Sequence, residues 1–170
     1  LIAFLATCHI GLAQVNQIDT SFGHQGSIYT SLDTVQLRSS ASIVQADGSI
    51  VVAGANGTGF VVRYLPNGNL DNSFGMNGIF TSSQFQTLSD VIQLANGKLL
   101  IGGSKKMALG GSASYKGLLA LLNTNGSIDT TFGSGGYSII PMDYGNDIHN
   151  SRVKVLEESN NGDIIVFGNG

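Results

Sequence analysis

Charge is scarce in this chain. Only 11% of the 170 residues are charged, roughly half the ~25% of an average globular domain. The formal net charge is −3, and Lys105-Lys106 is the one place where two basic residues are adjacent. The chain has no run of basic residues that could bind successive phosphates of a nucleic acid, so nucleic acid is not expected as a partner. Few charges and 24 glycines indicate a turn-rich, all-β extracellular protein.

Cysteine and histidine are rare too, with one cysteine and three histidines. Cys8 is the single cysteine, so the remainder of the chain offers no disulfide, thiolate metal site or cysteine nucleophile. His9, His24 and His149 lack the His-x-His or Glu-x-x-His spacing of a metal site. The sequence also suggests no nucleophile, base and orienting acid that would come together. We therefore expect no catalytic residues, no cofactor and no metal, with the calcium alternative discussed below.

The chain opens with an apolar run over residues 1–13. This run is too short to cross a bilayer, which takes ~20 residues. It fits the apolar region and cleavage site of a secretory signal, with Gly11 and Ala13 before Gln14. Because no Met or basic segment precedes it, we expect the remnant of a signal peptide and a secreted or cell-surface chain without a membrane span. A lipid anchor on Cys8 and a buried strand or helix are the alternatives.

One phrase occurs three times, as Asp-x-Ser/Thr-Phe-Gly-x-x-Gly at residues 19–26, 71–78 and 129–136. Successive copies are 52 and 58 residues apart, and a period of this size predicts a stacked or radial repeat architecture. We expect each phenylalanine to anchor the interior of one unit and the glycines to permit a tight turn. The repeated positions are Asp19, Phe22, Gly23, Gly26, Asp71, Phe74, Gly75, Gly78, Asp129, Phe132, Gly133 and Gly136.

Each repeat also carries an Asp-Gly or Asn-Gly pair between two apolar runs, at residues 45–54, 93–102 and 159–168. This pattern predicts a β-hairpin with a two-residue turn, because Gly, Asn and Asp tolerate positive φ best. A third apolar run follows, at 60–65 and 118–122, and a short fourth run comes after the Phe-Gly turn. Four antiparallel strands per repeat are the content of one β-propeller blade. An immunoglobulin-like sandwich and a parallel β-helix fit this period poorly.

The hairpin phrase Asp-Gly-x-Ile-Val-Val-Ala-Gly, followed by Arg-Tyr and Asn-Gly-x-Leu-Asp-x-Ser-Phe-Gly-x-x-Gly, resembles the bacterial delta-60 repeat over residues 17–170. The resemblance implies a propeller found in secreted and surface proteins, with a largely undefined function. Residues 14–170 hold about three blades, whereas propellers close with typically 4 to 8. We therefore expect a partial propeller, a fragment whose partners include other blades of the same full-length chain. Arg63 is not treated as a site, because the second repeat does not keep it.

Two loops carry oxygen-bearing side chains at alternating positions, at residues 67–71 and 123–129. Such loops can bind Ca²⁺, but each offers a single carboxylate, and Ca²⁺ takes 6–8 oxygen ligands. An aspartate that accepts backbone N–H bonds and braces the following turn explains the same residues. We favour the brace and keep calcium as the alternative.

The connections that vary in length gather at one end of the predicted strands, at residues 32–40, 54–59, 82–87, 104–117 and 142–152. In repeat proteins such insertions often form the binding face. The candidate binding residues are Lys105, Lys106, Tyr115 and Lys116 in one loop, and Asp143, Tyr144, Asp147, His149 and Arg152 in another. They favour a non-catalytic module that binds a protein or a glycan.

Two other functions stay open at this point. The first is a propeller enzyme, such as a lyase, a hydrolase or a quinone-type dehydrogenase, with its site in blades beyond this chain. The apolar runs at 50–53 and 99–101 offer no ionisable residues for such a site. The second is a structural spacer in a larger surface protein.

Overall fold

The computed structural model describes residues 18–28, 38–109, 112–140 and 150–169. The predicted signal-peptide remnant at residues 1–13, with Cys8 and His9, lies outside these ranges, as do Asp143, Tyr144, Asp147 and His149. Strands form all the regular structure of the described part, and it contains no helix that could span a membrane. The strands are β1 (Ser39–Val44), β2 (Ile50–Ala55), β3 (Gly59–Tyr64), β4 (Ile79–Ser82), β5 (Thr87–Gln93), β6 (Leu99–Leu109), β7 (Ser112–Leu122), β8 (Tyr137–Ile140), β9 (Arg152–Glu158) and β10 (Ile164–Asn169).

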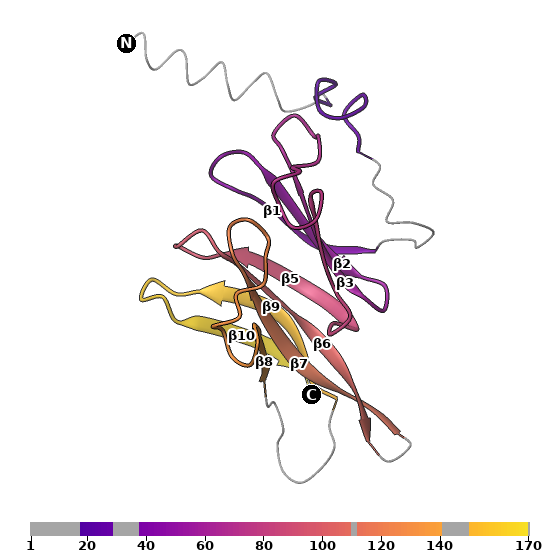
Figure 1. The fold of residues 1–170 in the computed structure, drawn as a ribbon, viewed down its shortest axis with the longest axis vertical. Helices are drawn as coiled ribbons and strands as arrows, with labels where there is room; N and C mark the ends of the chain where they lie inside the picture. The colour runs from indigo at the N-terminus through magenta and orange to yellow at the C-terminus, as the bar shows by residue number, and fades with distance from the viewer. Residues whose placement is uncertain (1–17, 29–37, 110–111, 141–149, 170) are drawn as a thin grey trace.

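The strands form two four-stranded antiparallel sheets and one hairpin (Figure 1). The sheet orders are β1-β2-β3-β4 and β5-β6-β7-β8, and β9 pairs with β10. Strand order in each sheet is the order along the chain, so one sheet is built from one continuous stretch. The Phe-Gly turn joins the third strand to the fourth. The predicted all-β fold with four antiparallel strands per unit is confirmed.

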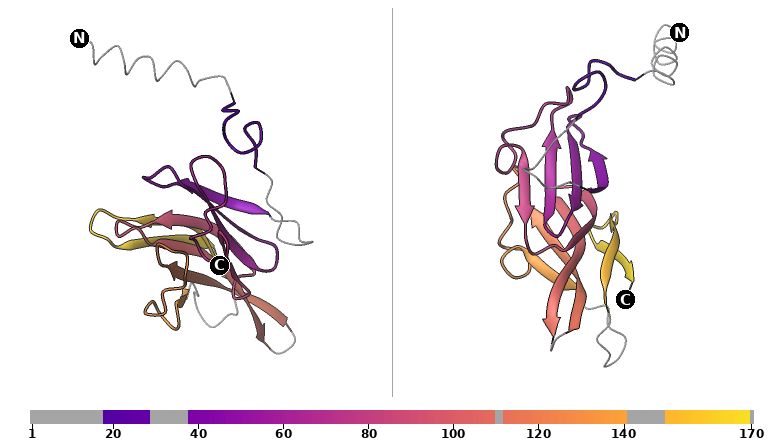
Figure 2. Two further views of the ribbon diagram at one scale, coloured as in Figure 1. Left: turned by 45° about the horizontal axis from the view of Figure 1, so that its top comes forward. Right: turned by 90° about the vertical axis from the view of Figure 1, so that its right-hand side faces the viewer.

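The second sheet lies between the first sheet and the β9–β10 hairpin (Figure 2). Strand β5 contacts β1 and β2 on one side and β9 on the other. The first strand of each unit, β1, β5 or β9, carries one extra residue at the same place, namely Ser40, Ser89 and Lys154. Such β-bulges bend a strand and increase its twist. The three units therefore meet along equally bent strands.

The core follows the alternation of side chains along β6 and β7. Leu99, Ile101 and Leu118 face the first sheet, whereas Leu100 and Leu119 face β9. Burial of one such side chain contributes about 1.5–3 kcal/mol to stability. Because both faces of the sheet are covered here, residues 99–101 of β6 and 118–122 of β7 are continuous apolar runs, whereas β5 keeps polar positions such as Asp90.

The hairpin turns differ from the predicted two-residue type. In the first turn the Gly48 N–H donates to the Gln45 carbonyl oxygen at 2.9 Å, and only Gly48, with φ +83°, adopts a positive φ. Asp47 stays outside that region, and its carboxylate accepts the Ser49 N–H at 2.9 Å. The turn is thus a four-residue turn that ends in a left-handed glycine, a common hairpin form. The Asp47 side chain accepts the N–H two residues further on, and Gly48 is the one residue of this turn with a positive φ.

The predicted loop at residues 104–117 is wrong, because β6 and β7 continue through it as a hairpin. We call residues 104–117 the hairpin arm. Lys105 pairs with Lys116 and Lys106 pairs with Tyr115, in continuous register with the rest of the sheet. Strand pairing gives the backbone groups of the insertion hydrogen-bond partners, which a loop would have to find elsewhere.

Candidate functional site

The two faces of the hairpin arm divide the residues that the sequence placed in one loop. Lys105 lies directly opposite Lys116, and the Lys105 Nζ donates a hydrogen bond to Gln84 Oε1 at 2.5 Å. Because neighbouring residues of a strand point to opposite faces, Lys106 and Tyr115 lie on the other face. The predicted set therefore forms two separate groups.

On that other face the structure brings together two predicted residues, Tyr115 and Arg152. The Arg152 guanidinium carbon lies 4.7 Å from the centre of the Tyr115 ring. The Tyr115 backbone binds the same segment, because its N–H donates to Asn150 Oδ1 and its carbonyl oxygen accepts the Ser151 N–H, each at 2.8 Å. These contacts fasten the start of β9 to the arm. This geometry gives Tyr115 and Arg152 a structural role.

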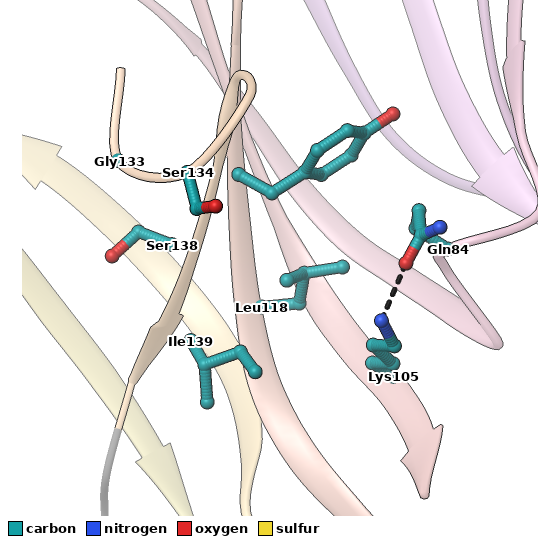
Figure 3. Close-up of a pocket in the computed structure, with 8 residues that line it drawn as sticks. Gln84, Lys105, Leu118, Gly133, Ser134, Ser138 and Ile139 are labelled. Atoms are coloured by element: carbon teal, nitrogen blue, oxygen red, sulfur yellow. Dashed lines mark hydrogen bonds between the residues drawn. The ribbon is translucent and has the colours of Figure 1, made fainter.

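On the Lys105 face lies an open groove, which we call the lysine groove (Figure 3). Its volume is about 500 Å³, within the range of ligand pockets. Leu118 and Ile139 line it with apolar surface, and Lys105 with Gln84 stands on one side of it. The remaining lining residues are Gly133, Ser134, Tyr137 and Ser138. Within the described residues Lys105 pairs with no carboxylate, so its charge faces the groove unneutralised.

Tyr137 is held firmly in place at this groove. Its hydroxyl shares a 2.8 Å hydrogen bond with Ser82 Oγ at the end of β4. Its ring centre lies 6.3 Å from that of Phe85 with a 54° tilt, and Phe85 is fully buried. Aromatic pairs of this geometry add about 0.5–1.5 kcal/mol. The groove therefore has a rigid wall where the first sheet meets the second.

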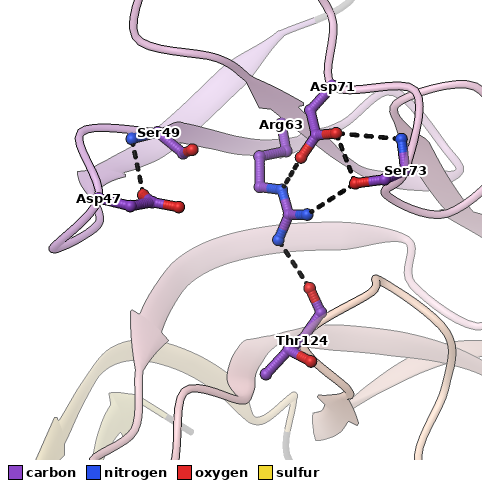
Figure 4. Close-up of polar contacts among 6 residues, drawn as sticks. All are labelled: Asp47, Ser49, Arg63, Asp71, Ser73 and Thr124. Carbon is purple, nitrogen blue, oxygen red and sulfur yellow. Dashed lines mark hydrogen bonds and ion pairs between the residues drawn. The ribbon is translucent and has the colours of Figure 1, made fainter.

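Arg63 forms a second polar centre that the sequence did not predict (Figure 4). Its Nε lies 2.6 Å from Asp71 Oδ2, and its Nη1 donates to the Thr124 carbonyl oxygen at 2.6 Å. The guanidinium carbon also lies 4.6 Å from the centre of the Phe74 ring. Since Thr124 belongs to the next repeat, Arg63 joins two repeats and is a structural residue.

The repeated aspartates brace the Phe-Gly turns. Asp71 Oδ1 accepts the Ser73 N–H at 3.0 Å and the Ser73 hydroxyl at 2.6 Å, and Asp129 makes the same pair of bonds to Thr131. The Ser73 hydroxyl, followed by the Ser73 amide and Arg63, holds the pKa of Asp71 below its usual range. This is the brace that the sequence favoured. Calcium stays an untested alternative, with the aspartate oxygens already engaged.

In the second repeat the cation comes from a different place. Lys98 Nζ lies 2.6 Å from Asp129 Oδ2 and is the largest cause that lowers the pKa of Asp129 to about 2. Leu121 occupies the place of Arg63, because the backbone carbonyl oxygen of each accepts the N–H of the repeated aspartate. Ser49 occupies the place of Lys98 at the start of the second strand. The two repeats therefore neutralise the same carboxylate from different strands.

Asn-Gly turns cover the Phe-Gly turns of the preceding repeat. The Gly23 N–H donates to the Asn67 carbonyl oxygen at 3.0 Å, and the Gly75 N–H donates to the Asn125 carbonyl oxygen at 2.7 Å. A Cβ on Gly126 would lie 2.7 Å from the Gly75 nitrogen, so no other residue fits there without displacement. Phe74, beneath this contact, is fully buried, whereas Phe22 and Phe132 are half-buried.

The described ranges hold no cluster of three His, Cys, Asp or Glu side chains that could bind a metal ion. His24, in the first Phe-Gly turn, is exposed. The polar groups of this part of the chain are thus arranged for hydrogen bonding and ion pairing within the fold and for contact at the groove.

Residues 45–74 and 94–132 match a family model described as a β-propeller domain of unknown function, DUF5122. Each matched segment runs from a hairpin turn to the phenylalanine of a Phe-Gly turn. The chain is a β-propeller repeat protein. Each four-stranded sheet is accordingly a blade, and β9–β10 supplies the first two strands of a third. No curated protein and no solved structure matches the chain.

In the propeller, the lysine groove lies on the second blade, close to where this blade adjoins the first. Sequence reasoning named Lys105 as a binding residue and Gly133 as a structural one, and it missed the other six, among them Gln84, Tyr137 and Ile139. One signal was available, since Tyr137 is an aromatic residue at the place that Ile79 occupies in the first blade. Ile139 carries no comparable signal, because it joins the groove through the pairing of β8 with β7, and Gln84 was marked only by its place in the variable connection at 82–87.

Proposed function

We propose that this chain is a non-catalytic binding module of an exported bacterial protein and that its lysine groove binds a glycan with carboxylate or sulfate groups. The observation that carries the proposal is the position of Lys105, which lines the groove and, within the described residues, donates a hydrogen bond to the neutral Gln84 amide. A lysine that lines a partly apolar groove without a carboxylate partner is suited to bind an anion through a charge-assisted hydrogen bond.

The lining of the groove supports a sugar as the ligand. Ile139 and the Tyr137 ring offer apolar surface for the C–H face of a sugar ring. Ser134 and Gln84 offer a hydroxyl and an amide group for its hydroxyls. The partner of Lys105 in the described part of the chain is the neutral Gln84 amide, so the lysine can form a charge-assisted hydrogen bond with an anion.

The placement at the cell exterior rests on residues 1–13 and on the low charge of the chain. A surface location would bring the groove into contact with polysaccharides. A spacer without any ligand is the competing function, and it differs from the proposal in a simple way, since a spacer binds no glycan at this groove.

The test compares two neighbouring lysines that point to opposite faces of the arm. Lys105→Gln should weaken binding of alginate or heparin about tenfold, because a hydrogen bond to a charged group contributes about 1.5–3 kcal/mol. Lys106→Gln removes the same charge from an exposed side chain on the other face and should leave affinity unchanged. Isothermal titration calorimetry gives both affinities, with neutral dextran as the control glycan.

Two results would contradict the proposal. Equal losses for Lys105→Gln and Lys106→Gln would indicate general charge attraction without a site. Binding of dextran as tight as that of alginate would show that the lysines do not select the ligand.

A further inference from the structure

Asparagine followed by glycine recurs along this chain, and the dipeptide can modify itself without an enzyme. The glycine nitrogen bonds to the side-chain carbonyl carbon of the asparagine, and the side-chain nitrogen leaves as ammonia with the proton that the backbone amide gives up. Water then opens the resulting succinimide ring to aspartate or isoaspartate. Glycine favours this step because it has no Cβ to hinder the approach. The pairs within the described residues are Asn56-Gly57, Asn67-Gly68, Asn77-Gly78, Asn96-Gly97, Asn125-Gly126 and Asn161-Gly162.

Five of these six glycine nitrogens are held by a backbone hydrogen bond. In the turns at residues 65–68, 94–97, 123–126 and 159–162 the glycine N–H donates to the carbonyl oxygen three residues before it, at 2.8 or 2.9 Å. The Gly78 N–H donates to the Phe74 carbonyl oxygen at 2.8 Å. The nitrogen attacks only after it has given up its proton, so a bonded N–H must first open, as it must for hydrogen exchange. The fold therefore protects these five pairs.

Three of the protected asparagines are restrained a second time. The side-chain oxygens of Asn67, Asn96 and Asn125 each accept the N–H two residues further on, at 3.0 Å. Ring closure reorients this carbonyl group, so that bond would be lost as well. Gly68 and Gly126 are also buried against the Phe-Gly turn of the preceding repeat, which leaves their nitrogens out of reach of solvent.

Asn56-Gly57 is built differently, because it belongs to the three-residue link between β2 and β3. The Asn56 N–H donates to the Thr58 carbonyl oxygen at 3.3 Å, and all three residues of the link are exposed. Within the described part of the chain the Gly57 N–H makes no hydrogen bond. Apart from its sequence neighbours, only Gln86 Nε2, at 3.7 Å, lies within 4 Å of a Cβ built on Gly57. Solvent therefore has direct access to this nitrogen.

We propose that Asn56 is a site of spontaneous modification, at which the folded chain forms a succinimide and then aspartate or isoaspartate. The reaction consumes water and releases ammonia, and it needs no other reactant. It adds one negative charge and so changes the formal net charge from −3 to −4. Isoaspartate also adds one backbone atom to the link, directly beside the Ala55–Gly59 pair that ends the β2–β3 ladder.

Exposure alone does not select Asn56. Asn161 and Gly162 are exposed as well, and no heavy atom lies within 4 Å of a Cβ built on Gly162. The Gly162 N–H nevertheless donates to the Ser159 carbonyl oxygen at 2.9 Å. The two pairs thus differ in the hydrogen bond of the attacking nitrogen, and Asn161 is the internal reference for the experiment.

The experiment incubates the folded full chain in mildly alkaline buffer and follows each pair by tryptic peptide mapping with mass spectrometry. Cleavage after Arg38 and Arg63 gives a peptide in which Asn56 is the one asparagine, and fragmentation assigns the other pairs. Asn56 should be converted at least about fivefold faster than Asn161, the factor that corresponds to a net hydrogen bond of typical strength. The other four pairs should be converted no faster than Asn161.

Two controls isolate the cause. In a digest incubated in the same buffer the peptides have no fold, so Asn56 and Asn161 should be converted at similar rates. In the folded variant Gly57→Asn, asparagine tolerates the φ of +77°, but its Cβ hinders the attack, so conversion of Asn56 should fall to the rate of Asn161 or below. A melting curve checks that this variant is folded.

Three results would overturn the proposal. Equal conversion of Asn56 and Asn161 in the folded chain would show that the hydrogen bond gives no protection. A folded chain that leaves Asn56 intact while the digest is converted would show that the link protects this pair too. Unchanged conversion in folded Gly57→Asn would indicate direct hydrolysis of the side chain by water, without attack by the backbone nitrogen.

Discussion

At the scale of single residues, two cations from different strands neutralise equivalent aspartates. Arg63 pairs with Asp71, and Lys98 pairs with Asp129, in both cases at 2.6 Å. Both aspartates are nearly buried, and removal of one partner of a buried pair leaves a charge without compensation. The cation is thus required in each blade, whereas its position on the strand can change.

The first prediction moves the cation of the first blade to the position used in the second. Arg63→Leu should destabilise the chain by about 2–4 kcal/mol, since it leaves Asp71 without its cation and removes the bond to Thr124. Adding Ser49→Lys should restore more than half of the loss. Chemical denaturation measures both free energies of unfolding. If Ser49→Lys is equally destabilising with and without Arg63→Leu, the two positions do not serve the same carboxylate.

The second prediction separates backbone strain from close packing at two glycines. Gly126 and Gly162 have φ values of +79° and +84°, but no heavy atom lies within 4 Å of a Cβ built on Gly162. Asparagine tolerates this φ, so Gly162→Asn should cost less than about 1 kcal/mol. Gly126→Asn should cost at least about 2 kcal/mol, because the turn must move away from Gly75. Thermal melting of both variants measures the loss of stability. Equal losses would show that Gly126 is needed only for its φ.

At the scale of strands and turns, one carboxylate joins β5 to β9, the first strands of two neighbouring blades. Asp90 on β5 accepts the Val91 N–H through Oδ1 at 2.9 Å and the Leu156 N–H of β9 through Oδ2 at 2.7 Å. Unpaired N–H groups on a strand edge invite association with other chains. Asp90 therefore both joins two blades and protects their edges.

Asp90→Ala should therefore loosen β9 more than the rest of the molecule. We expect a stability loss of about 1–3 kcal/mol, the usual cost when a hydrogen-bond partner is removed. Amide exchange at Leu156 should accelerate well beyond that of the β2–β3 pair. Asp163→Ala, at an exposed carboxylate that bonds neither strand edge, is the control and should leave Leu156 unchanged. Uniform acceleration across all three sheets would contradict a local role.

Sequence patterns predicted the second and third strands of each blade well, because β2, β3 and the inner parts of β6 and β7 are apolar runs next to a turn signal. The hairpin arm was missed for a physical reason. Residues 104–117 contain lysines and glycines that resemble a loop, and their strand structure comes from pairing with one another. Arg63 was dismissed because the second repeat lacks it, although the equivalent cation, Lys98, stands on another strand. Such substitutions are visible only once the side chains are placed in space.

The lysine groove was the least predictable feature. Lys105 was selected for its charge, but Ile139 joins it through the pairing of β8 with β7, and Gln84 joins it from the connection between β4 and β5. Contacts of this kind depend on register and tertiary packing, which no local pattern specifies. The sequence therefore predicts blades much better than the surfaces between them.

At the scale of the whole molecule, neighbouring blades stabilise one another through apolar clusters that they share. One apolar cluster joins the first blade to the second, and another joins the second blade to β9. Repeat proteins of this type gain stability from each unit and from each contact between neighbours. The aspartate braces repeat along this series, so acid acts on several blades at once.

Acid should therefore destabilise the chain in a defined range. The pKa of Asp129 lies at about 2 in the folded chain, below its ordinary value of 3.8. Between these values the unfolded chain binds more protons, so stability falls as pH falls from about 4 to about 2. Lys98→Gln removes the largest cause of the shift and should reduce this dependence while lowering stability at pH 7. Lys154→Gln, at an exposed lysine, should keep the wild-type pH dependence in denaturation curves.

The exchange of cations between strands also bears on how such a gene can evolve. Consider recombination between the two repeats with a crossover after the codon of Ser49 or Lys98 and before that of Arg63 or Leu121. One product combines Ser49 with Leu121 and leaves the aspartate with no cation. The reciprocal product combines Lys98 with Arg63 and directs two cations at one carboxylate. Repeats that look interchangeable in sequence are therefore inherited as linked sets, and viable crossovers should fall outside this interval.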